Sequence, residues 1–177
     1  VLAIYPKGND MSRILTIRNK LLSLRGQMDI NDEHDQSLFT AKGELSFIFS
    51  PTWRIFDSQN KLATIKKKKL TFRPTYSVRS IFGSYTVKRK LLSWTRQYYV
   101  VDGMYEGATA NGSLLDLAFT ISHGEREISS ASEKLISLRD THVIVVNEDE
   151  EPDVLFTTVM MVIMQLDKKN DSVAVSD

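Results

Sequence analysis

The chain has 177 residues, a net charge of +1 and an ordinary share of apolar and charged residues, so it is long enough to bury a core as one domain. It contains no cysteine, which excludes disulfides, zinc–thiolate sites, iron–sulfur clusters and thiol catalysis, and which suits a cytoplasmic protein. We expect a single domain over 11–170, a flexible tail over 171–177, and an extension over 1–10, before Met11, that derives from cloning or from an upstream reading frame.

The small net charge hides an uneven distribution. Residues 58–101 contain eleven bases and no acid, whereas residues 102–177 contain fifteen acids and five bases. Such asymmetry is typical of a protein with an anionic partner, such as nucleic acid or membrane lipid. The alternative is that the two halves neutralise each other in the folded protein.

Short β-strands are predicted along most of the chain. Polar turn formers at 31–35 and 57–60 separate neighbouring strands, and Asn111-Gly112 indicates a further turn. Turns about every 8–12 residues are typical of a barrel or a sandwich. The predicted strands are 13–17, 27–30, 37–41, 45–49, 53–56, 62–65, 76–78, 84–88, 97–101, 115–121, 127–130 and 141–146.

Residues 154–166 (VLFTTVMMVIMQL) are the most uniformly apolar run in the chain. The run is shorter than the about 20 residues that span a bilayer and matches a buried core helix. Pro152, the acids of 148–153 and the bases of 168–169 suit the two ends of a helix. Because a helix that is apolar on every face needs surroundings on every side, we predict a β-sheet wrapped around it; a buried strand is the alternative.

Two pairs of segments resemble each other within the chain. Residues 20–30 (KLLSLRGQMDI) are similar to residues 90–100 (KLLSWTRQYYV), and residues 69–78 form a fainter third copy. Residues 53–62 and 119–128 both read as strand, polar turn and strand. A duplicated β-unit would account for these pairs, and coincidence is the alternative.

Taken in order, these segments resemble the LURP-one-related family, which belongs with the C-terminal domain of Tubby proteins and with phospholipid scramblases. The resemblance is carried by the terminal apolar helix and by KLLS (20–23), WRIFD (53–57), LATIKKKKL (62–70) and FRPTY (72–76). It implies a mainly β fold, a closed antiparallel β-barrel of about 12 strands around a central hydrophobic C-terminal α-helix, which fills a barrel too wide for side chains alone. The family implies no settled activity. Tubby domains bind phosphoinositides through basic side chains, whereas a scramblase-like activity is not expected because the chain has no cysteine for palmitoylation.

Residues typical of catalysis are few. The chain has no nucleophile elbow, phosphate-binding loop, dinucleotide fingerprint or HExxH motif, and His34, His123 and His142 have no histidine at metal-ligand spacing. Residues 29–35 begin like a calcium loop, but His34 replaces its glycine and Thr40 replaces its bidentate glutamate, so we expect a hairpin tip. We therefore predict no catalytic residue, no metal and no cofactor.

Basic side chains form the best candidate site. Alternate lysines of a strand point to opposite faces, so two of the four in 66–69 face one way, and 88–90 lies on a nearby strand. Each base near an anionic membrane surface contributes about 1 kcal/mol. The alternatives are solvated strand ends that discourage edge pairing and partners for the acidic half. The candidates for anionic-ligand binding are Lys66, Lys67, Lys68, Lys69, Arg73, Lys88, Arg89 and Lys90.

Aromatic residues near these bases do not form the pattern of a nucleic-acid-binding domain, so a nucleic-acid partner is not expected. We expect them in the core or the girdle of the barrel. They are Phe72, Tyr76, Tyr85, Trp94, Tyr98 and Tyr99.

The leading functional hypothesis is a non-enzymatic Tubby-like binding module, peripheral at a membrane and without a transmembrane segment. Its partner would be an anionic phospholipid surface or a protein. The alternatives are an enzyme with a site at the barrel mouth, which no motif supports, and a scaffold or oligomer subunit.

Overall fold

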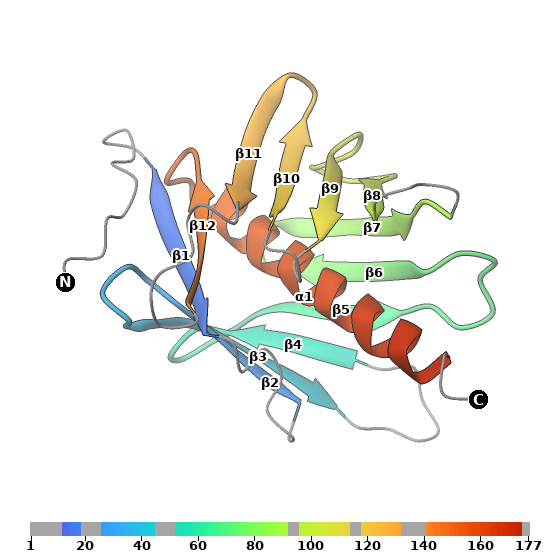
Figure 1. Cartoon of the computed structure of the whole chain (residues 1–177), viewed down its shortest axis with the longest axis horizontal. Helices are drawn as coiled ribbons and strands as arrows, with labels where there is room; N and C mark the ends of the chain where they lie inside the picture. The colour runs from blue at the N-terminus through green and yellow to red at the C-terminus, as the bar shows by residue number, and fades with distance from the viewer. Residues whose placement is uncertain are drawn as a thin grey trace.

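The computed structural model describes residues 12–18, 26–44, 52–91, 96–113, 118–131 and 141–174. They form twelve strands followed by one helix, α1 (Glu151–Ala174), which runs through the middle of the strands (Figure 1). The strands are β1 (Arg13–Arg18), β2 (Gln27–Asn31), β3 (Ser37–Glu44), β4 (Thr52–Phe56), β5 (Lys61–Lys67), β6 (Thr75–Ser80), β7 (Gly83–Arg89), β8 (Gln97–Val100), β9 (Thr109–Ser113), β10 (Ala118–His123), β11 (Arg126–Ala131) and β12 (Thr141–Val146).

The strands form a closed antiparallel barrel. Each strand pairs with its neighbours in sequence, and β1 also pairs with β12 over its whole length, from Arg13 opposite Val146 to Arg18 opposite Thr141. Closure leaves no unpaired sheet edge. The predicted barrel around a central C-terminal helix is therefore confirmed.

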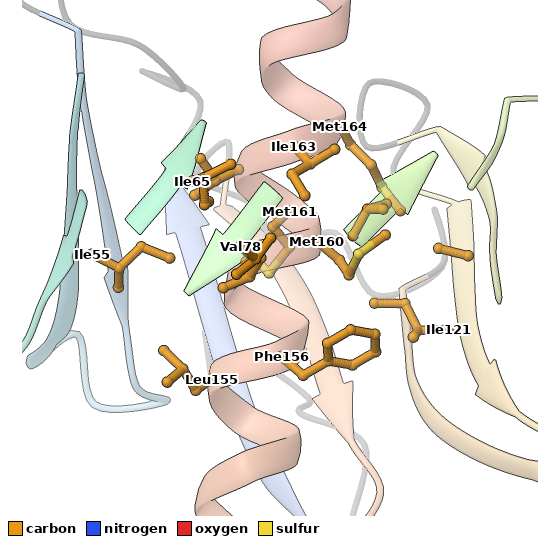
Figure 2. Close-up of a cluster of buried hydrophobic side chains, with 14 of the residues drawn as sticks. Ile55, Ile65, Val78, Ile121, Leu155, Phe156, Met160, Met161, Ile163 and Met164 are labelled. Atoms are coloured by element: carbon orange, nitrogen blue, oxygen red, sulfur yellow. The ribbon is translucent and has the colours of Figure 1, made fainter. Parts of the chain in front are cut away.

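The inward-facing side chains of the strands help to fill the interior of the barrel. Buried and partly exposed residues alternate in β4, where Trp53 and Ile55 are buried, and in β5, where Ala63 and Ile65 are buried. Successive side chains of a strand point to opposite faces, so one apolar set from every strand meets inside. In Figure 2 such wall residues surround side chains that leave α1 in several directions.

The helix is buried on every face from Asp153 to Asp167, as predicted for residues 154–166. In Figure 2 the side chain of Leu155 points to the side of the helix on which Ile55 lies, and that of Phe156 points to the side of Ile121. It begins three residues earlier than predicted and continues to residue 174, through part of the segment expected to be a tail. Residues 167–174 contain neither glycine nor proline, so no residue there stops the helix.

The turn predicted at Asn111-Gly112 is wrong, because both residues lie inside β9. Gly112 lies opposite Phe119 of β10. Its φ is +111°, and a Cβ atom added there would overlap the carbonyl oxygen of Ala118. The glycine therefore permits a close approach of two strands. The predicted strand at 45–49 lies outside the described residues.

The internal resemblance falls on strands that lie six places apart in the barrel. Residues 27–30 and 97–100 belong to β2 and β8, and the pair 53–62 and 119–128 belongs to β4–β5 and β10–β11. Six of twelve strands is half of the barrel, which is the spacing expected of a duplicated unit. The KLLS part of the first pair lies outside the described residues, apart from its residues 90 and 91.

A charge placed in the middle of α1 is expected to prevent folding. Met160 is 1% exposed, and Met160→Asp would bury a carboxyl group without a partner and remove an apolar side chain from the core, at a combined cost comparable to the about 5–15 kcal/mol that stabilises a domain. We expect Met160→Asp to yield no cooperative thermal transition in circular dichroism. Met160→Leu conserves volume and should melt within a few degrees of the parent protein. A folded Met160→Asp variant would contradict the core role of α1.

Candidate anionic-ligand site

The structure places the eight predicted bases at one end of the barrel, toward which α1 runs with its C-terminus (Figure 1). β5 and β7 end there, and β6 and β8 begin there. Lys68 N donates a hydrogen bond to Thr75 O (2.8 Å), and Arg89 N donates one to Pro74 O (2.9 Å), so the segment 68–74 lies against the end of β7. We call residues 66–74 and 88–91 the basic end.

Only the first two lysines of the run lie in β5, where they point to opposite faces of the sheet as predicted, and Lys68 and Lys69 lie beyond the end of the strand. Lys66 points outward and is exposed. Lys67 follows Ile65 on the inward side and is half-buried at the rim of the barrel, with its Nζ 6.0 Å from the centroid of the Tyr76 ring. Lys67 therefore covers the edge of the core, and Lys66 remains directed toward solvent.

Three further bases lie together near the outer surface of β6, β7 and β8. Lys88 lies between Thr75 on β6 and Tyr99 on β8. Lys68 is hydrogen-bonded through its backbone to Thr75. Arg73 Nη1 donates to the hydroxyl of Tyr99 (2.7 Å), which ties the segment 68–74 to β8. Lys68, Arg73 and Lys88 thus lie close to one another in the fold.

Arg89 points inward and has a different role. Its Nη1 lies 3.3 Å from Oδ2 of Asp167, which is 1% exposed. The hydroxyl of Tyr98 donates to the same oxygen (3.1 Å), and that of Tyr76 donates to Oδ1. The charge of Arg89 is compensated by a buried carboxylate of α1, which leaves the outward bases to meet a ligand.

A second buried carboxylate, that of Asp153, makes similar contacts at the N-terminal end of α1. The hydroxyl of Tyr105 donates to Oδ1 of Asp153 (2.8 Å), and Nη1 of Arg126 lies 2.5 Å from Oδ2. Phe156, one turn further along α1, stacks on the Tyr105 ring with centroids 3.9 Å apart. Sequence reasoning missed both carboxylates; the available signal was an aspartate immediately before and after the apolar run.

The acidic run 148–153 lies at this second end, away from the basic end. Arg13 pairs with Asp149 (2.6 Å) and Glu151 (3.2 Å), and Arg126 pairs with Glu148 (3.1 Å) as well as with Asp153. Both arginines lie outside the acid-free stretch 58–101. Glu148, Asp149, Glu151 and Asp153 are therefore paired with nearby arginines, whereas Asp167, also from the acidic half of the sequence, pairs with Arg89 at the basic end.

Burial raises the pKa of four tyrosine hydroxyls far above the usual 10.0. For Tyr76 and Tyr98 the neighbouring Asp167 carboxylate adds to the effect of burial on the pKa. For Tyr105 the hydrogen bond to Asp153 does so, and for Tyr85 the neighbouring Tyr105 raises the pKa further. A phenolate there would lose hydration and face a negative charge.

The aromatic residues near the bases divide into two groups. Tyr76, Tyr85 and Tyr98 are buried, as predicted. The core or girdle position predicted for Phe72 is wrong, since the residue lies between β5 and β6 and its side chain is 93% exposed. Phe72 lies in a connection between strands, where no alternation directs side chains inward. The remaining two are Tyr99, which is partly exposed, and Trp94, which lies outside the described residues.

The remaining candidates from the sequence are the calcium-like loop and the three histidines. Residues 32–36 make the predicted hairpin tip, in which Asp32 Oδ1 accepts hydrogen bonds from the backbone N–H groups of His34 (2.9 Å) and Gln36 (2.8 Å). His34 is exposed, and His123 Nε2 lies 3.0 Å from the carbonyl oxygen of Glu106. The side chain of His142 lies outside the described part of the chain.

Neutralising Asp167 should destabilise the fold without changing the outward bases. Asp167→Asn leaves Arg89 without its carboxylate and gives two tyrosine hydroxyls a poorer hydrogen-bond acceptor. We expect the free energy of unfolding to fall by about 1–3 kcal/mol. Glu33→Gln, in an exposed turn, removes the same charge and should cost less than about 0.5 kcal/mol. Urea denaturation of the two variants measures the difference, and equal midpoints would contradict the role of Asp167.

Stability should fall as the pH rises above 10. The folded tyrosines keep their protons there while the unfolded chain releases them, so the free energy of unfolding drops by about 1.4 kcal/mol per pH unit for each such residue; below pH 10 this contribution is fully present. Spectrophotometric titration should show four of the six tyrosines ionising only as the protein unfolds. Ionisation of all six near pH 10 with unchanged circular dichroism would contradict this.

Comparison with known proteins agrees with this architecture. None of the curated protein sequences compared with the chain matches it significantly. An X-ray structure of a protein from Arabidopsis thaliana has the same fold, with a TM-score of 0.61 and 18% sequence identity over 93% of this chain and 96% of that one. The model of the LURP-one-related family matches residues 13–165, nearly the whole barrel and its helix, and the chain therefore belongs to the LURP-one-related family.

Proposed function

We propose that this LURP-one-related chain is a non-enzymatic binding module that recognises anionic phospholipid headgroups through the basic end of its barrel. The observation that carries the proposal is the gathering of bases from three separate places in the sequence, 66–69, 73 and 88–90, at the ends of adjacent strands. The acidic run lies at the other end, so the molecule presents one cationic end to an anionic surface.

The outward bases supply the attraction. Lys66, Lys68, Lys69 and Lys90 are exposed, and Lys88 is partly exposed beside them. At about 1 kcal/mol per base near an anionic bilayer, four or five bases provide about 4–5 kcal/mol, which corresponds to a Kd between about 1 mM and about 0.2 mM. Exposed charges are screened over about 10 Å at 0.1 M salt, so binding should weaken as salt increases.

Two other features favour a binding role. Asp153 and Asp167, the buried carboxylates that an enzyme at the barrel mouth would use, already accept hydrogen bonds from tyrosine and arginine side chains. In addition, none of the described helices is both long and apolar enough to cross a bilayer, and α1 is covered by the barrel wall. Contact with a membrane would therefore fall to the outer surface.

Charge reversal tests the proposal. In Lys66→Glu/Lys68→Glu/Lys88→Glu, three outward bases of the basic end are replaced, and we expect co-sedimentation with phosphoinositide-containing vesicles to fall by about a hundredfold or more. The measurement is made at low salt and at about 0.15 M salt, where binding of the parent protein should be weaker.

The matched control is Lys42→Glu/Lys61→Glu/Arg79→Glu, which changes the net charge equally at exposed positions outside the basic end. It should lose much less binding than the first variant. Parent protein that stays in the supernatant at low salt, or equal losses in the two triple variants, would contradict the proposal.

A further inference from the structure

The segment 68–74 exposes two large apolar side chains. Leu70 is fully exposed and Phe72 is 93% exposed, whereas the wall residues of β5 and β6 on either side are buried. Leu91, which follows Lys90 at the same end, is 45% exposed. Exposed apolar side chains gathered beside polar ones mark a surface that meets a partner.

One residue of this segment, Leu70, also has an unfavourable backbone conformation. Leu70 has a φ of +58°, in the left-handed region that glycine and asparagine adopt most readily and a leucine rarely does. Neither the conformation nor the exposure of Leu70 stabilises the barrel. Unfavourable backbone geometry of this kind is concentrated at binding sites.

The charges around the two side chains indicate the chemistry of the partner. Lys68 and Lys69 precede Leu70, and Arg73 follows Phe72 with its guanidinium held on Tyr99. Cations on flexible stems beside projecting apolar groups match the bilayer interface, where phosphates lie above acyl chains.

We propose that the segment 68–74 inserts Leu70 and Phe72 among the acyl chains of an anionic phospholipid bilayer while its bases contact the headgroups. The inference rests on the proposed function and extends it, because the ligand becomes an assembled membrane surface rather than a single headgroup. A headgroup in water offers nothing to Leu70 and Phe72, so the protein should prefer vesicles to the free headgroup.

The first test removes the apolar groups and keeps every charge. Leu70→Asn/Phe72→Ser should reduce partition onto phosphatidylcholine vesicles containing phosphatidylserine by about tenfold or more at 0.15 M salt, and its Tm should be unchanged or higher. Ile81→Ser/Phe82→Ser is the matched control, since it removes two exposed apolar side chains from the turn at the opposite end of β6 and should bind like the parent protein.

The second test reports insertion directly. The chain has no cysteine, so Thr71→Cys provides a unique attachment point for a nitrobenzoxadiazole dye between the two apolar residues. Its emission should shift to the blue with anionic vesicles but not with glycerophosphoserine. The same dye at Gln59→Cys, in the turn between β4 and β5 at the other end of β5, should show no shift.

The outcomes separate the two proposals. If the parent protein binds vesicles while Leu70→Asn/Phe72→Ser binds equally and the dye at residue 71 does not respond, insertion is overturned and headgroup recognition stands. If the parent protein does not bind anionic vesicles even at low salt, both are overturned. Self-association seen by light scattering, abolished by the double variant and without vesicle binding, would assign Leu70 and Phe72 to a protein interface and overturn insertion.

Discussion

Two buried carboxylates fix the depth at which α1 lies in the barrel. Asp153 and Asp167 are fourteen residues apart, about 21 Å along a helix, and every residue between them is buried. Each carboxylate meets an arginine and at least one tyrosine from the wall. Since a slip of one residue would leave charges unpaired in the core, these clusters give the helix a register that apolar packing alone would specify less sharply.

The basic end is built on the second of these clusters. Asp167 ties together the inward side chains of Tyr76, Arg89 and Tyr98, which lie at the ends of β6, β7 and β8. Lys88 and Lys90 adjoin Arg89 and are partly or fully exposed, and the segment 68–74 lies against the end of β7. The ligand-facing groups thus lie on strand ends that the core holds in place, while their charged tips remain solvated.

Much of this arrangement is predictable because it depends on local patterns. Alternation and turn formers locate most strands, and the length of the apolar run separates a core helix from a membrane span. Gly112 was misjudged because a glycine needed for close strand approach is indistinguishable in sequence from one in a turn. Asp153 was assigned only to the start of the helix, and Phe72 to the core or the girdle, because the partners of Asp153 and the exposure of Phe72 depend on contacts between distant segments.

The pairing of β1 with β12 also bears on how the protein is made. The strand that closes the barrel and the helix that fills it are both encoded after residue 140. Until they leave the ribosome, the earlier strands have two open edges and an inner apolar face with nothing to cover it. A chain that stalls or is cut before this point cannot cover that apolar face. The last fifth of the sequence therefore decides whether the product is a folded domain or a substrate for chaperones and proteases.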